Sequence, residues 1–88
     1  MSVIWKTTLY SLVDQQIMVP EGAEMLCARD QMNHICVWYR CNPAAKLVPR
    51  TLIVVGTGDV APGSDARYLG TAGCGGQLIV HVFEQTRA

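Results

Sequence analysis

Short runs of β-branched and aromatic residues, each ended by turn-forming residues, recur along the whole chain. In the clearest run, Ile35, Val37 and Tyr39 alternate with Cys36 and Trp38, which is the period-two pattern of a strand with two different faces. Seven such runs predict seven strands. They are Val3–Tyr10, Gln15–Val19, Ala23–Arg29, His34–Cys41, Arg50–Val55, Arg67–Ala72 and Gln77–Glu84.

This spacing predicts a mainly β fold, in which residues 1–88 form a single-domain antiparallel β-sandwich or a small barrel of about seven short strands. Residues 23–32 contain good helix formers, so helix is the alternative there, but the neighbouring strands favour strand. The run Arg50–Val55 is rich in Val, Ile and Leu and predicts a strand buried on both faces. Asp30–Asn33 and Gly75–Gly76 predict hairpin loops. Ala44–Leu47 has the length of one helical turn.

Composition limits the classes of partner. Half of the residues are hydrophobic and 16% are charged, which excludes a disordered chain and favours burial in a homo-oligomer. The formal net charge is zero and the Lys and Arg residues are scattered, so nucleic acid is not expected as a partner. The longest apolar run is far shorter than a membrane span, so no membrane insertion is expected.

The four cysteines bear on compartment and on metal binding. Because no secretory signal precedes them, we expect reduced thiols and a cytoplasmic location. Zinc sites usually contain close cysteine pairs, and none is present. His34 and Cys36 share a strand face, with Cys27 across a hairpin, which leaves a three-ligand cluster as an alternative to buried structural thiols. We therefore expect neither metal nor cofactor.

The segment Gly56–Ala61 follows an apolar strand and matches G-x-G-x-x-A, a form of the dinucleotide-binding fingerprint. That fingerprint needs a helix immediately afterwards, and Pro62–Asp65 reads as loop. The segment is therefore interpreted as a loop that requires a flexible backbone. Its backbone N–H groups, together with a nearby guanidinium, form a candidate site for a small anionic ligand. The candidate residues are Gly56, Thr57, Gly58, Asp59 and Arg67.

No arrangement of side chains predicts catalysis. Cys74 and His81 lie seven residues apart along a predicted hairpin, a separation that does not bring a nucleophile to its base. The carboxylates are dispersed, without the pairing that acid–base chemistry requires. Trp5, Trp38 and Phe83 are interpreted as anchors of the core.

Several segments resemble a family of small proteins from tailed phages and prophages that carries a domain of unknown function. They are Ile4–Lys6, Leu52–Gly58, Tyr68–Thr71 and Gly75–Glu84, so the similarity extends over nearly the whole chain. The resemblance implies a phage-encoded accessory protein in a bacterial cytoplasm. It transfers no catalytic or ligand-binding residue.

These observations favour a non-catalytic protein that acts by binding a host protein or a small anionic ligand. A structural protein of the virion and a small Cys/His metal-binding protein remain the alternatives.

Overall fold

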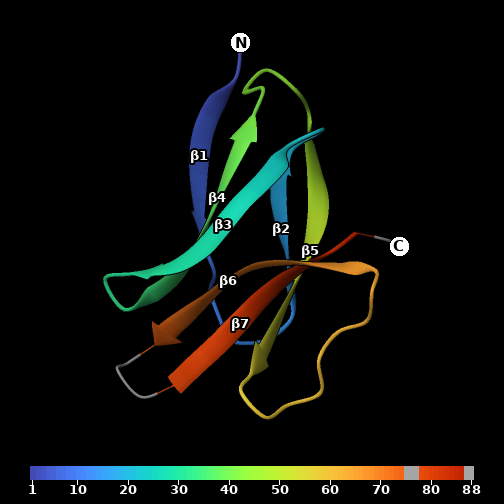
Figure 1. Cartoon of the computed structure of the whole chain (residues 1–88). Coiled ribbons are helices and arrows are strands. Elements are labelled where there is room, and N and C mark those ends of the chain that lie inside the picture. Colours follow the sequence, from blue (N-terminus) through green and yellow to red (C-terminus); the bar gives the residue numbers. More distant parts are fainter. Residues whose placement is uncertain (75–77, 87–88) are drawn as a thin grey trace.

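The protein is a sandwich of two antiparallel β-sheets (Figure 1). A computed structural model describes residues 1–74 and 78–86. Its strands are β1 (Val3–Thr8), β2 (Gln15–Pro20), β3 (Glu24–Gln31), β4 (His34–Cys41), β5 (Leu47–Gly56), β6 (Ala66–Cys74) and β7 (Leu78–Gln85). A three-stranded sheet has the order β1-β4-β3, and a four-stranded sheet has the order β2-β5-β7-β6. Among the described residues, no helix has the length and hydropathy that crossing a membrane requires.

The predicted β class and the seven strands are confirmed, with the sandwich as the form. Strand is also confirmed for residues 24–31, because pairing with β4 outweighs the helix propensity of this segment. The predicted loop Asp30–Asn33 shortens to Met32 and Asn33, both with positive φ. Residues 42–45 form a hydrogen-bonded turn and not a helical one. The predicted Gly75–Gly76 loop lies outside the described residues.

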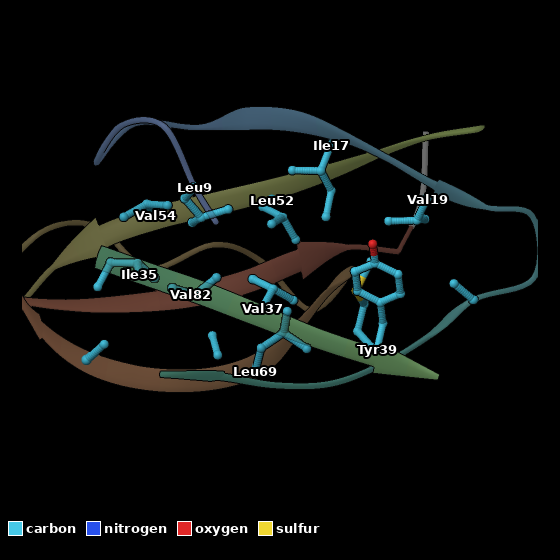
Figure 2. Packing of buried hydrophobic residues seen from close by; sticks show 14 of the residues in the cluster. Leu9, Ile17, Val19, Ile35, Val37, Tyr39, Leu52, Val54, Leu69 and Val82 are labelled. Carbon is cyan, nitrogen blue, oxygen red and sulfur yellow. The ribbon is translucent and has the colours of Figure 1, made fainter. Parts of the chain in front are cut away.

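The core lies between the two sheets, where inward-facing side chains of both sheets meet (Figure 2). Ile35, Val37 and Tyr39 point inward from β4, while Leu52 and Val54 point inward from β5. Strict alternation places one residue in two on this face. The prediction that Arg50–Val55 is buried on both faces is therefore met only on the inner face, at Leu52 and Val54, because the outward residues are half-buried.

The prediction that Trp5, Trp38 and Phe83 anchor the core was wrong. Trp38 and Phe83 are half-buried on the outer faces of the two sheets, and Trp5 lies on the edge strand β1 with 41% of its surface exposed. Tyr39 is the aromatic residue of the described core, and its hydroxyl hydrogen-bonds with Thr7 Oγ1 at 2.9 Å. A tyrosine is buried here at low cost because its polar group has a partner.

The sheets come closest where β3 lies against β6. Both strands carry a β-bulge at this corner, between Met25 and Cys27 and between Tyr68 and Gly70. A Cβ atom on Gly70 would overlap the carbonyl of Ala28, so only glycine permits this approach. The bulges bend the two edge strands toward each other and close this side of the sandwich.

One charged pair lies at the edge of the core. The carboxylate of Glu84, which is 3% exposed, accepts a hydrogen bond from Arg50 Nε at 2.5 Å. Arg50 also donates to the carbonyl of Ala23 at 2.9 Å. The pair therefore connects β5 to β7 and to the start of β3.

Candidate functional site

A small hollow of about 210 Å³ opens on the outer face of the four-stranded sheet. The loop after β5 forms one wall, through residues that include Thr57 and Asp59. Outward side chains of the sheet form the floor, with Tyr68 from β6 and His81 and Phe83 from β7. The hollow thus joins the loop singled out in the sequence to three ring-bearing side chains.

The loop wall is held by a tight turn. The N–H of Asp59 donates to the carbonyl of Gly56 at 3.1 Å, and the N–H of Gly56 donates to Asp59 Oδ2 at 3.1 Å. Gly58 has a φ of 96°, a conformation that favours glycine. The glycines therefore serve the turn, and two of the backbone N–H groups expected to meet an anion are used within the loop.

His81 lies at the centre of a chain of hydrogen bonds. Its Nε2 hydrogen-bonds with Thr57 Oγ1 at 2.8 Å, and its Nδ1 hydrogen-bonds with Thr71 Oγ1 at 2.9 Å. Thr71 stands directly opposite His81 in the β6–β7 register, and its hydroxyl also contacts the hydroxyl of Tyr68 at 2.5 Å. Because hydroxyls both donate and accept, this chain holds the imidazole in place in either tautomer.

Two aromatic rings complete the floor. Tyr68 and Phe83 are paired across β6 and β7, with ring centroids 5.5 Å apart and planes at 64°. This edge-to-face arrangement is favourable and leaves Tyr68 55% exposed. A bound molecule would therefore meet apolar ring surface on the floor and hydrogen-bonding groups beside it.

The structure brings together four of the five candidate ligand residues. Gly56, Thr57, Gly58 and Asp59 all line the hollow. Arg67 does not line it, because it lies next to Tyr68 on β6 and alternation places its side chain on the opposite face. The carboxylate of Asp59 is the charge nearest the loop backbone, since it caps Gly56.

Sequence reasoning missed Tyr68, His81 and Phe83 as site residues. The available signal was the period-two series Ile79, His81 and Phe83, which places one histidine and one aromatic ring on the same face of β7. Phe83 was interpreted as a core anchor because an apolar series alone does not show which face is inward.

The three candidate metal ligands Cys27, His34 and Cys36 have other neighbours in the structure. Within the described residues, no three side chains among His, Cys, Asp and Glu group as metal ligands. Cys27 stands opposite Trp38, Cys36 is buried beside Thr8, and His34 hydrogen-bonds with the carbonyl of Met32. Cys27, Cys36 and Cys41 are free thiols. The Cys74 side chain lies outside the described part of the chain.

A wider depression of about 680 Å³ lies on the outer face of the three-stranded sheet, around Trp38. Two pairs of long polar side chains on this face bond to each other. Lys6 donates to Gln31, and Arg40 donates to Glu24 at 2.6 Å. Mutual pairing of exposed charges is typical of a solvated surface. The hollow at His81 is therefore the better-formed candidate site.

Fold and site together define a small β-sandwich domain with an open, histidine-centred hollow on one sheet face. The chain belongs to the family described as domain of unknown function DUF7352, whose model matches residues 1–88. No curated protein and no solved structure was found to match it.

Proposed function

We propose that this chain is a non-catalytic binding protein that takes a small ligand in the hollow at His81. The observation that carries the proposal is the chain of hydrogen bonds from Thr57 through His81 and Thr71 to Tyr68, because it fixes polar groups beside an open aromatic floor. Binding sites combine apolar surface with a few fixed polar groups in this way.

The chemistry of the hollow indicates the kind of ligand. Both ring nitrogens of His81 are bonded to threonine hydroxyls, so the hydroxyls of Thr57 and Tyr68 at the ends of the chain are the groups left to meet a ligand. A hydroxyl can donate to an acceptor such as a carboxylate or a carbonyl. The rings of Tyr68 and Phe83 suit a flat apolar body. A ligand of about one ring with an acceptor group matches a volume of about 210 Å³.

Whether the acceptor is anionic depends on nearby charges. The carboxylate of Asp59 lines the hollow and opposes a carboxylate ligand, whereas the hydroxyls of Thr57 and Tyr68 can donate to one. A small anionic ligand therefore stays part of the proposal, with a neutral carbonyl compound as its direct competitor.

We also propose that the protein originates from a phage or prophage and acts in the bacterial cytoplasm. This proposal rests on the segments of the sequence that resemble the phage family.

Benzoate and benzamide test the site, because they share a shape and differ in charge. Titration of either one, followed by amide chemical shifts in NMR, is expected to move the signals of Thr57, Tyr68 and His81. Stronger binding of benzoate would support the anionic ligand. The absence of any shift at these residues with both probes, at millimolar concentration, would overturn the proposed site.

Matched variants separate the hollow from its surroundings. Thr57→Val removes a hydroxyl that contacts His81 and is expected to weaken probe binding about fivefold, since a lost hydrogen bond costs about 1 kcal/mol. Thr51→Val makes the same change on the same sheet face outside the hollow and is expected to leave binding unchanged. Equal loss in both variants would contradict the assignment.

A further inference from the structure

Among the described residues, the outward strand positions of the four-stranded sheet hold no Asp, Glu, Lys or Arg, and the carboxylate at its hollow, Asp59, belongs to the loop after β5. Outward positions on its strands hold Met18, Thr51, Ile53, Val55, Ile79 and Phe83, with uncharged polar residues between them. The outward face of an antiparallel sheet normally carries charged and polar residues when water covers it. This face is therefore composed like a surface that another layer covers.

The three-stranded sheet shows the contrast within the same molecule. Its outer face carries Lys6, Arg29 and Arg40 as well as Glu24. Among the described residues, charged side chains therefore lie on the outer face of one sheet and not on the outer face of the other. Composition alone does not account for the difference between the two faces.

The face is large enough for a stable interface. Its four strands, about 4.8 Å apart and of 6 to 10 residues, cover about 500 Å² of sheet in all. Two such faces together come to about 1,000 Å², which is the total area that a specific interface between proteins requires.

We propose that a second copy of this chain covers this face, with the two four-stranded sheets packed against each other. An occupant has to be uncharged over a similar area, because an unpaired charge buried here would be costly. The charged face of the three-stranded sheet does not meet that condition, whereas an identical uncharged face does. Pairing of like faces about a two-fold axis also closes after two copies, so no polymer forms.

The dimer also completes the proposed ligand site, and this part of the inference rests on the proposed function. The hollow at His81 opens on the face that the second copy covers, so each copy supplies a roof for the site of the other. A flat ligand would then lie between two sheets, shielded from water. In a single chain, the hollow lacks this roof and is open to solvent.

The test is the mass of the protein in solution, measured by sedimentation equilibrium. The wild-type chain is expected at twice its mass of 9.6 kDa. Ile53→Lys places a charge at the centre of the face and is expected to halve the observed mass. The matched control Ile4→Lys adds the same charge at an outward, 64% exposed position of the three-stranded sheet and is expected to leave the dimer intact.

Circular dichroism shows whether each variant keeps its β structure. If Ile53→Lys does not fold, Thr51→Lys supplies the same test at a neighbouring outward position. A monomeric wild-type chain at millimolar concentration, or a dimer that both face variants leave intact, would overturn the proposal. Thr57→Val is expected to weaken probe binding and to keep the dimer mass, so failure of the ligand site and failure of the dimer are distinguishable.

Discussion

Glu84 and Arg50 show how one buried charge is made tolerable. The glutamate lies on the inner face of β7 and is nearly without contact with water, while the arginine side chain keeps 26% of its surface exposed. The guanidinium satisfies the carboxylate and a backbone carbonyl together. A buried pair of this kind contributes modestly when intact, but removal of one partner leaves an uncompensated charge.

Arg50→Met is therefore expected to lower the free energy of unfolding by about 3 kcal/mol, because Glu84 stays buried without its partner. The double variant Arg50→Met with Glu84→Met is expected to recover most of that loss. Urea unfolding at one fixed protein concentration measures both. A double variant that is no more stable than the single one would show that packing, and not the unpaired charge, accounts for the effect.

For single residues, the sequence predicted where the site lies better than it predicted which side chains form it. It singled out the loop Gly56–Asp59, which does form a wall of the hollow, because glycines mark backbone demands that can be read locally. It did not find Tyr68 or His81. Apolar residues lie on both faces of β5 and β7, so the pattern alone does not decide which face turns inward.

The elements were predicted more completely. All seven strands were expected, and β4 has the expected ends at His34 and Cys41. The largest boundary error is β5, which begins at Leu47 and not at Arg50. This extension exists because residues 47–49 pair with β2, and pairing partners are not visible in a local pattern.

The β3–β4 hairpin carries a local conflict that a substitution can relieve. Met32 and Asn33 have φ values of 52° and 67°, the left-handed pair of a two-residue turn. Methionine occupies this region at a cost of about 1 kcal/mol, whereas asparagine tolerates it. The Met32 side chain is 89% exposed, so it contributes little packing.

Met32→Asn is therefore expected to raise the free energy of unfolding by about 0.5–1 kcal/mol. Met32→Val is the opposing control, because a β-branched residue fits positive φ worse than methionine and is expected to destabilise the hairpin. Thermal and urea unfolding measure both changes. Equal stability of the two variants would show that this turn relaxes without strain.

The arrangement of the whole molecule was the least predictable level. β1 pairs with β4 and β2 pairs with β5, so β1 and β2 belong to different sheets although they are consecutive in sequence. These pairings depend on contacts between distant segments, such as the approach of Gly70 to Ala28 that closes one side of the sandwich. Turn signals predict hairpins, but they do not predict which longer connections cross between sheets.

The uncharged face of the four-stranded sheet also has a consequence for the stability of the whole molecule. If two copies bury this face together, folding and association are linked, and the melting temperature depends on protein concentration. The wild-type chain is expected to melt at a higher temperature as it is concentrated. A monomeric domain would melt at one temperature throughout, since its unfolding involves no change in the number of particles.

Ile53→Lys is expected to remove this dependence, while Ile4→Lys keeps it, because only the first substitution places a charge within the shared face. Differential scanning calorimetry over a wide range of concentrations measures the slope for all three proteins. A flat wild-type slope contradicts the coupling directly. A slope that persists in Ile53→Lys places the association on another surface, because the charged side chain has then not been buried between the copies.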